Sequence, residues 1–560
     1  MAVALMVGEV GFVGKATHQL RWGTVALTLL FALEQGINWL RSRNRRLYLR
    51  ASGLHVSVAV GALVMMGLLL LTDPEAGAYN KVSLLFYVAV QGAIFCSLSL
   101  RALKHQARLT ALRIRPGWLL IGSFALIIGI GTLLLKLPRA IAAGEHFSWL
   151  DALFTSTSTV CVTGLAVENT AHFFTPTGQI ILLALIQIGG LGIMTITFYL
   201  STMLFHGMSM YDRQCLGEMI SEKHLAHVSH ALRFIILFTL SSELLGAVWI
   251  YGALPSDHGV TERAFQAVFH SISAFCNAGF STLPDGLADS WVRGNVSLQA
   301  CISLLIILGG MGSLVIRDLL LWFQARFQRL QNPASPRVRL RVHTRLVLTV
   351  TLILLVGGAL AMGVSEYLLF KGQENGGRWI TAWFFSATAR TAGFNTVDMG
   401  GIGPVTAQIL ILLMLIGGSP GGTAGGMRTT VFAVAALHLW NQLRMFPQLI
   451  LFRRRLPDML GPRALVVLVL TTAWLFVNLA ILRQLEPRVE GASLIFELVS
   501  AFATVGLSLN LTPELSDGAK GLLIVNMFVG RIGLMTLLTS LVPATRRRPL
   551  QYPTEDILLL

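Results

Sequence analysis

Four glycines recur along this chain at nearly constant spacing, each at the end of a segment of small residues. They are Gly164, Gly279, Gly393 and Gly506, and they are separated by 115, 114 and 113 residues. A period of this length suggests four similar units that meet at one axis. Glycine suits such a position because it adopts positive φ and lets carbonyls turn toward a common centre. Ion filters made of backbone oxygens are built in this way.

The composition places these units in a membrane. The chain has 560 residues, of which 54% are hydrophobic and 12% are charged, whereas about 25% are charged in an average soluble protein. Several apolar runs reach the ~20 residues that a helix needs to cross a bilayer. These runs are continuous rather than alternating, which argues against a strand barrel. We therefore predict an all-α polytopic membrane protein with four span–pore-loop–span repeats around one pore, plus three extra N-terminal spans.

The formal net charge of +16 gathers in the segments between apolar runs. Basic clusters at 41–50, 101–115, 326–345 and 444–463 alternate with loops that hold the glycine segments and several acids. The positive-inside rule assigns the basic clusters to the cytoplasm. The charge therefore indicates a multi-pass protein of the cell (inner) membrane, with the lipid bilayer and not nucleic acid as its surroundings.

The predicted units follow one another along the chain. We predict extra transmembrane spans at 1–116, repeat 1 at 117–206, repeat 2 at 207–324, repeat 3 at 325–441, repeat 4 at 442–543 and a cytoplasmic tail at 544–560. Each repeat contains a segment that is too short to cross and is expected to form a re-entrant half-helix. These segments are Phe147–Val160, Thr261–Phe275, Gly377–Ala389 and Gly491–Ala503. The carboxyl end of a half-helix carries partial negative charge, which favours a cation.

The segments before the four glycines contain neutral hydroxyl and amide groups, and Arg390 is their one charged residue. A monovalent cation needs neutral oxygens, which replace its water without binding it too tightly. The predicted K⁺ filter residues are Val162, Thr163, Gly164, Asn277, Ala278, Gly279, Thr391, Ala392, Gly393, Thr504, Val505 and Gly506, and the hydroxyls of Ser158, Ser273, Thr388 and Ser500 accompany them. The alternative is a set of small-residue helix contacts, which leaves the constant period unexplained.

The second span of repeat 3 is interrupted by a run of glycine, serine and threonine. Six glycines and Pro420 lie between Leu415 and Thr430, and the matching spans of the other repeats lack this insertion. Such a sequence does not hold a regular lipid-facing helix. A flexible loop inside a pore is a candidate gate, and the alternative is a helix break packed against its neighbours. The predicted gate residues are Gly417, Gly418, Ser419, Gly421, Gly422, Thr423, Gly425, Gly426 and Arg531.

Arg531 lies in the middle of the last apolar span. An arginine at membrane depth is costly and faces a cavity or a partner. The carbonyls of the glycine loop are its natural partners, and its charge would oppose the passage of cations. The alternative is a purely structural tie to a helix end. For Arg390 we favour a structural bond to carbonyls behind the filter.

The quoted segments resemble the Trk/Ktr/HKT superfamily of potassium transporters over about Trp118 to Leu541. STVCVTGL, SAFCNAGFST, SATARTAGFNT and SAFATVGLSLN resemble its four pore loops, GGSPGGTAGGMRTT its intramembrane gating loop and GRIGLMT its last-span arginine motif. The resemblance implies a homodimer with one pore per subunit and a cytosolic RCK-type nucleotide-binding regulatory ring (KtrA/TrkA-like) as partner. It assigns the filter glycines to the four named above, the gating loop to Gly417 through Gly426 and the barrier arginine to Arg531. Four filter glycines favour K⁺, whereas a serine in the first repeat would favour Na⁺.

We therefore predict potassium uptake through a gated filter, with no catalysed reaction and no cofactor in this chain. The regulatory nucleotide is expected on the partner subunit. The alternatives are a Na⁺-permeable or Na⁺-coupled K⁺ transporter, a non-conducting sensor or scaffold, and a membrane enzyme. An enzyme would need clustered His, Asp or Glu inside the spans, but the histidines are scattered and Glu243 stands out as a lone intramembrane acid.

Overall fold

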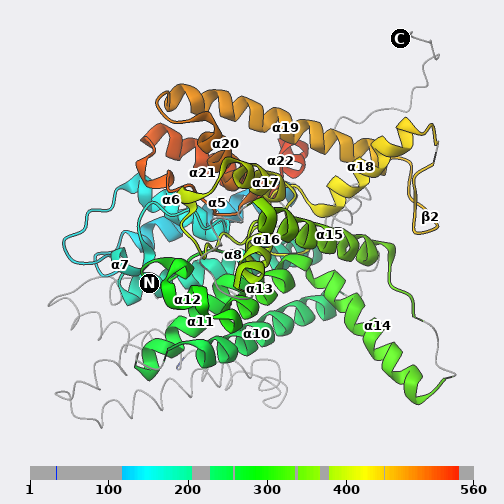
Figure 1. Cartoon of the computed structure of the whole chain (residues 1–560), viewed down its shortest axis with the longest axis horizontal. Coiled ribbons are helices and arrows are strands. Elements are labelled where there is room, and N and C mark those ends of the chain that lie inside the picture. The colour runs from blue at the N-terminus through cyan, green and yellow to red at the C-terminus, as the bar shows by residue number, and fades with distance from the viewer. Residues whose placement is uncertain are drawn as a thin grey trace.

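The computed structural model describes residue 33 and residues 116–204, 228–255, 259–333, 338–365, 377–446 and 448–541. These segments are mostly helical (Figure 1), and they contain a short antiparallel ribbon of β1 (Ile450–Leu451) and β2 (Arg454–Arg455). The three spans predicted at 22–40, 51–72 and 82–100 lie outside the described residues, apart from Leu33.

The helices fall into four consecutive groups, which we call units 1 to 4. Unit 1 has α5 (Pro116–Leu135), α6 (Trp149–Val160), α7 (Thr170–Phe173) and α8 (Pro176–Leu204). Unit 2 has α10 (Val228–Ala253), α11 (Val260–Cys276), η4 (Gly286–Ala288), α12 (Ser290–Gly294), α13 (Val296–Met311) and α14 (Ser313–Gln331). Unit 3 has α15 (Val342–Ser365), α16 (Gly377–Thr388), η5 (Met399–Gly401), α17 (Pro404–Leu415) and α18 (Thr429–Leu443). Unit 4 has α19 (Leu460–Leu485), α20 (Gly491–Ala503), η6 (Thr512–Glu514), α21 (Asp517–Ile532) and α22 (Leu534–Leu541).

Each unit contains one of the short helices α6, α11, α16 and α20, and these coincide within a few residues with the half-helices that the sequence predicts. Among the described residues, three helical stretches are long and apolar enough to cross a membrane: Phe234–Ala253, Val342–Ser365 and Leu460–Leu485. Helices α13 and α14 meet this criterion only together, as a pair bent by 100°. In Figure 1, α19 lies at the top and α10 at the bottom, with α8, α13 and α16 between them.

Two second spans are broken where the sequence predicts continuous helices over Val296–Phe323 and Gly518–Leu541. Gly312 (φ 85°) separates α13 from α14, and Gly533 (φ 90°) separates α21 from α22. Glycine takes these positive φ values without a steric penalty. The glycine at the break in unit 2 also leaves room for the interrupted span of unit 3. A Cβ on Gly312 would lie only 2.7 Å from the carbonyl oxygen of Pro420, so a larger residue would collide with that span.

In units 1 to 3, the short helix packs against the first helix of its own unit through a serine that faces a glycine. Each serine hydroxyl donates to a carbonyl of that first helix: Ser156 to Ile128 (2.7 Å), Ser271 to Glu243 (2.6 Å) and Ser386 to Leu355 (2.8 Å). The facing glycines are Gly131, Gly246 and Gly358, where a Cβ would come within 2.5 Å of the serine oxygen. Small residues allow the close helix approach that is typical of membrane proteins.

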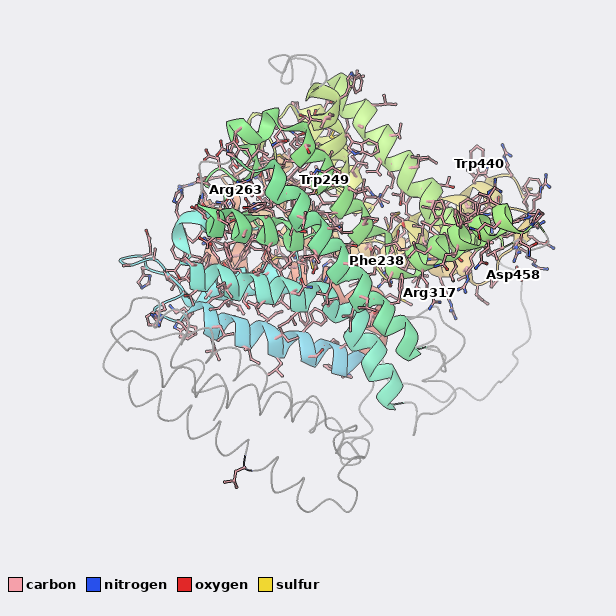
Figure 2. All side chains as sticks on the ribbon, turned by 90° about the horizontal axis from the view of Figure 1, so that it is seen from below. Phe238, Trp249, Arg263, Arg317, Trp440 and Asp458 are labelled. Carbon is pink, nitrogen blue, oxygen red and sulfur yellow. The ribbon has the colours of Figure 1, made fainter. Side chains whose placement is uncertain are left out.

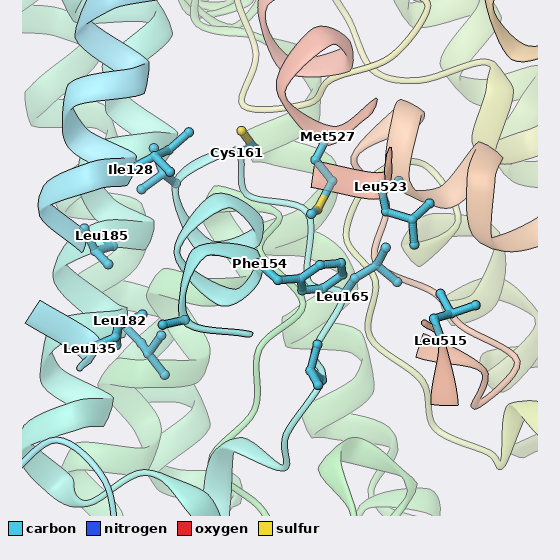
Figure 3. Packing of buried hydrophobic residues seen from close by; sticks show 14 of the residues in the cluster. Ile128, Leu135, Phe154, Cys161, Leu165, Leu182, Leu185, Leu515, Leu523 and Met527 are labelled. Atoms are coloured by element: carbon cyan, nitrogen blue, oxygen red, sulfur yellow. The ribbon is translucent and has the colours of Figure 1, made fainter. Parts of the chain in front are cut away.

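Units 1 and 4, which are furthest apart in the sequence, adjoin one another. Their buried hydrophobic side chains form one cluster, in which Phe154 and Leu165 of unit 1 lie near Leu515, Leu523 and Met527 of unit 4 (Figure 3). This contact brings the last unit back to the first, so the short helices of all four units can surround a common centre.

Arg317 and Trp440, which adjoin the basic clusters at 326–345 and 444–463, lie on the same side of the molecule. In Figure 2, Arg263 lies near the turn between α10 and α11, whereas Arg317, Trp440 and Asp458 lie together toward the opposite side. Arg263 belongs to α11, in a segment that the positive-inside rule predicts to be outside, and Arg317 and Trp440 adjoin basic clusters that it predicts to be inside.

Candidate functional site

Each short helix is followed by a residue in the left-handed conformation, two positions before the repeated glycine. These residues are Val162 (φ 57°), Asn277 (φ 60°), Thr391 (φ 85°) and Thr504 (φ 51°). In units 1, 2 and 4 the next N–H bonds back five residues: Thr163 to Ser158 (2.7 Å), Ala278 to Ser273 (2.7 Å) and Val505 to Ser500 (2.9 Å). This is a Schellman ending, which satisfies the last carbonyls of a helix. In unit 3 the corresponding bond comes from Gly393 to Thr388, at 3.3 Å.

The four repeated glycines form a closed ring, here called the glycine ring. Their φ values lie between 71° and 95°, and each faces the carbonyl oxygen of the residue before the next glycine. A Cβ would lie 2.6 Å from Ala278 if built on Gly164, 2.5 Å from Ala392 if built on Gly279, 2.2 Å from Val505 if built on Gly393 and 2.1 Å from Thr163 if built on Gly506. Only glycine fits such a ring, because both the backbone conformation and the neighbouring carbonyl exclude a side chain.

The hydroxyls that the sequence associates with the predicted filter form hydrogen bonds with the backbone around the glycine ring. Ser158 and Ser500 accept hydrogen bonds from the N–H groups of Gly164 and Gly506, both at 3.1 Å. In the other two units the hydroxyl donates to the carbonyl that follows the glycine: Ser273 to Phe280 and Thr388 to Phe394, both at 2.8 Å. These side chains therefore hold the backbone of the ring segments in place.

The remaining predicted filter residues are buried around the ring. Thr163 and Thr504 are fully buried, and their hydroxyls find no hydrogen-bond partner in the described part of the chain. Asn277 and Thr391 join units 2 and 3, with the Asn277 amide best oriented to accept from Thr391 Oγ1 at 3.2 Å and to donate to Ala274 at 3.0 Å. Three apolar positions of the ring, Ala278, Ala392 and Val505, have no exposed surface, and Val162 is 1% exposed.

The interrupted span of unit 3 forms a loop over residues 416–428, here called the unit 3 loop. Its two ends are joined by a bond from Gly417 N–H to the Met427 carbonyl (2.9 Å) and by one from Thr429 N–H to the Gly418 carbonyl (3.0 Å). The loop thus has a defined backbone structure, although it is not helical.

The unit 3 loop is bonded to the second spans of two other units. On unit 2, the bonds run from Ser419 N–H to Gly310 (3.0 Å), from Thr423 N–H to Gly309 (3.2 Å) and from Ser313 N–H to Gly421 (3.2 Å). On unit 4, Gly426 N–H donates to Gly530 (3.4 Å). A Cβ on Gly425 would lie 2.1 Å from Thr504 Oγ1. The loop therefore lies directly beside the glycine ring.

Arg531 ties this loop to unit 1. Its side chain is 3% exposed, and Nη1 donates to the carbonyl of Thr423 while Nη2 donates to that of Gly189 at 2.8 Å. The sequence suggested the loop carbonyls as partners but gave no signal for Gly189. Arg390 is also buried, and its Nη2 donates to the Gly417 carbonyl at 3.5 Å.

The sequence also matches a known protein family. Residues 87–546 match the family model TrkH, described as cation transport protein. The chain belongs to the TrkH family of cation transport proteins. Because this family transports ions and carries out no catalysed reaction, the prediction of a transporter rather than an enzyme is confirmed. The resemblance to the Trk/Ktr superfamily is confirmed as well.

Several relatives of this TrkH family member are named as uptake proteins. The "Ktr system potassium uptake protein B" of Bacillus subtilis is 35% identical, over 79% of this chain and 96% of its own length. The "Potassium/sodium uptake protein NtpJ" of Enterococcus hirae is 33% identical, over 80% and 98%. The crystal structure of the potassium transporter TrkH from Vibrio parahaemolyticus matches 93% of this chain and 98% of its own, with TM-score 0.61 and 19% identity. At that identity, the structural match shows a common fold.

The N-terminal end of α6 carries an ion pair that joins units 1 and 4 of this TrkH family member. Asp151 accepts from Lys520 Nζ at 2.9 Å and from the Ser148 hydroxyl at 2.6 Å. Glu168 lies in the same acidic region, in the loop after Gly164. Burial, and then the negative charges of Asp151 and Glu145, raise the pKa of Glu168, while Lys520 opposes the rise.

We expect Lys520→Met to lower the melting temperature of the purified protein. The Asp151 and Lys520 side chains are only 17% and 10% exposed, and removing one partner leaves a largely buried carboxylate without its countercharge. The matched control is Arg455→Met, which breaks a pair with Asp458 at the same 2.9 Å but with side chains 57% and 65% exposed. Exposed pairs contribute about 0 to 1 kcal/mol, so the control should change the melting temperature little. Equal shifts in the two variants would contradict the role given to Lys520.

Proposed function

We propose that this chain is a potassium uptake pore of the cell (inner) membrane, built from four repeats whose glycine segments form one K⁺ filter. The observation that carries this proposal is the glycine ring, in which four backbone segments of the same conformation adjoin in the order 1, 2, 3, 4 and back to 1. The names of the Bacillus and Vibrio relatives support potassium as the ion. The repeats correspond to 117–206, 207–324, 325–441 and 442–543.

In this proposal the ion exchanges its water for neutral oxygens of the ring segments. Helices α6, α11, α16 and α20 all end at the ring, so the partial negative charges of their carboxyl ends favour a cation there. Within the four ring segments, 161–165, 276–280, 390–394 and 503–507, buried Arg390 is the one charged residue. A monovalent ion can then bind and leave. Inward movement of one positive charge gains about 2.3 kcal/mol for each 100 mV of membrane potential.

The unit 3 loop and Arg531 form the gate of the proposed pore. The loop lies beside Thr504 of the ring and is bonded to the second spans of units 2 and 4. Arg531 bonds to this loop and places a positive charge beside it. That charge raises the energy barrier to a passing cation as long as the loop holds the arginine side chain in place. Gating then requires the loop to move away from these contacts.

The pore acts with partners in this proposal. Two copies of the chain form a homodimer with one pore each, and an RCK-type nucleotide-binding ring on the cytoplasmic side moves the gate. The relative from Bacillus is named as a component of a Ktr system, which supports a membrane subunit that works with others. The nucleotide binds to the cytosolic regulatory ring, and this chain carries no cofactor of its own.

A second candidate is a transporter that also passes sodium or couples K⁺ to Na⁺. The name of the Enterococcus relative, a potassium/sodium uptake protein, favours it. Four ring glycines favour the first candidate, since the resemblance associates a serine in the first repeat with Na⁺.

Cation flux into proteoliposomes that hold the purified chain tests both candidates. With K⁺, Rb⁺, Na⁺ and Li⁺ compared at one imposed potential, we expect K⁺ and Rb⁺ to enter well ahead of Na⁺ and Li⁺. Equal K⁺ and Na⁺ flux would favour the second candidate. If flux is absent even when the loop is deleted from Gly418 to Gly425, the chain is not a pore. Liposomes without protein give the background.

A further inference from the structure

Two of the four short helices carry a buried polar residue that bonds to the segment beyond the glycine ring. They are His270 on α11 and Glu497 on α20, which are 2% and 0% exposed. Each lies nine residues before the ring glycine of its unit. A serine, Ser281 or Ser508, follows two residues after that glycine and so lies eleven residues after the buried polar residue. The proposed function gives these residues no role.

Glu497 accepts hydrogen bonds from two hydroxyls of the segment that follows Gly506. Ser508 donates to its Oε1, and Thr512 Oγ1 lies 3.2 Å from both carboxylate oxygens. The Ser508 oxygen in turn accepts from the N–H of Leu511 at 3.2 Å. A buried carboxylate is tolerated only with such bonds, so Glu497 and this segment hold each other in place.

His270 makes the same arrangement with a different acceptor. Its Nδ1 lies 2.8 Å from the Gln266 carbonyl, which can only accept, so Nδ1 carries the proton. Nε2 of the neutral ring is then an acceptor, and it lies 2.8 Å from Ser281 Oγ. The Ser281 oxygen accepts from the N–H of Leu283 at 3.1 Å. In units 2 and 4, the serine two residues after the ring glycine thus donates a hydrogen bond to the buried side chain of the short helix. The same serine accepts a hydrogen bond from a backbone N–H further along the chain.

Units 1 and 3 lack this pair. The helix position just before the serine that faces the first helix is Thr155 in unit 1 and Phe385 in unit 3. The position two residues after the ring glycine is Ala166 in unit 1 and Asn395 in unit 3. Alanine has no hydroxyl to donate and phenylalanine has no acceptor. Because the units follow in order around the ring, the two serine contacts lie in opposite units.

We propose that His270 and Glu497 are positioning residues that set the selectivity of the pore by fixing Ser281 and Ser508 in two opposite units. This inference rests on the proposed function of the ring as a filter. Gly506 is then held from both sides, by the Ser500 hydroxyl on its own N–H and by the Ser508–Glu497 contact two residues later. The ring oxygens keep their spacing only while the segment beyond them stays fixed, and that spacing distinguishes K⁺ from Na⁺.

The test compares Ser508→Ala, Ser281→Ala and Glu497→Leu with the unmodified chain, in proteoliposomes with K⁺ and Na⁺. We expect each variant to lower the K⁺/Na⁺ flux ratio by about tenfold, the factor that corresponds to 1.4 kcal/mol. Glu497→Gln should lower it less, because an amide oxygen still accepts from Ser508. The matched control is Thr155→Val, at the equivalent position of unit 1, where the hydroxyl has no partner in the described structure.

The outcomes separate this inference from the proposed function. No discrimination by the unmodified chain would overturn both. A selective unmodified chain whose ratio survives Ser508→Ala and Ser281→Ala overturns the positioning role alone. A fall in total flux at an unchanged ratio also overturns it, because general damage to the fold would have that result. A ratio that falls in both serine variants but not in Thr155→Val supports it.

Discussion

Gly506→Ala is expected to abolish the preference of the pore for K⁺ over Na⁺. Gly506 has a φ of 93° and its Cβ would lie 2.1 Å from the carbonyl oxygen of Thr163. A residue other than glycine in this conformation costs on the order of 1 to 3 kcal/mol, and the contact with Thr163 adds to that. Either the Gly506 backbone or the Thr163 carbonyl must move, and both belong to the ring. The measurement is the K⁺/Na⁺ flux ratio in proteoliposomes, with size-exclusion chromatography to establish folding.

Gly144→Ala is the matched control for this prediction. Gly144 has the same φ of 93°, but a Cβ there meets nothing within 4 Å. The control therefore introduces the same backbone strain without touching the ring, and we expect it to keep the ratio of the unmodified chain. A folded Gly506→Ala variant with an unchanged ratio would show that the ring is not the filter.

Arg531→Gln is expected to raise K⁺ flux in the absence of any regulatory partner. The substitution removes the positive charge and weakens the bonds to Thr423 and Gly189. Hydrogen bonds to charged groups contribute about 1.5 to 3 kcal/mol each. Losing one of them shifts the balance between a held and a released loop by about tenfold or more. Initial rates of Rb⁺ uptake into proteoliposomes measure the change.

The control for the arginine variant is Arg488→Gln, the same change at an exposed position beyond the end of α19. It should leave uptake at the rate of the unmodified chain. Uptake that stays unchanged in a folded Arg531→Gln variant would assign Arg531 to the structural alternative, as a tie between α21 and its neighbours. Deleting Gly418 to Gly425 gives a second measure, since removal of the loop itself should raise uptake as well.

The short helices and the glycines could be predicted because both depend on local sequence. The predicted half-helix Gly491–Ala503 has the bounds of α20, and Phe147–Val160 overlaps α6. A segment length that is too short for a span, and a glycine where the backbone turns, are properties of a few neighbouring residues. The assignment of these residues to an ion path remains a prediction.

The features that depend on contacts between units were not predictable in the same way. The break at Gly312 follows from the passage of Pro420 nearby, and the bond from Arg531 to Gly189 joins residues 342 positions apart. Glu497 did leave a signal, since it is a carboxylate within an apolar half-helix. Glu243, the acid that the sequence singles out, also has a partner, because Gln187 donates to it at 3.1 Å.

The attachment of the unit 3 loop has a consequence for how the proposed pore would behave in time. The loop is bonded to units 2 and 4, and through Arg531 to unit 1. Releasing one of these contacts while the others remain leaves polar backbone groups without partners, which is costly in a buried site. The contacts are thus expected to break together. Single-molecule current records would then show abrupt steps between two levels with long closed dwell times, and not a continuous range of conductances.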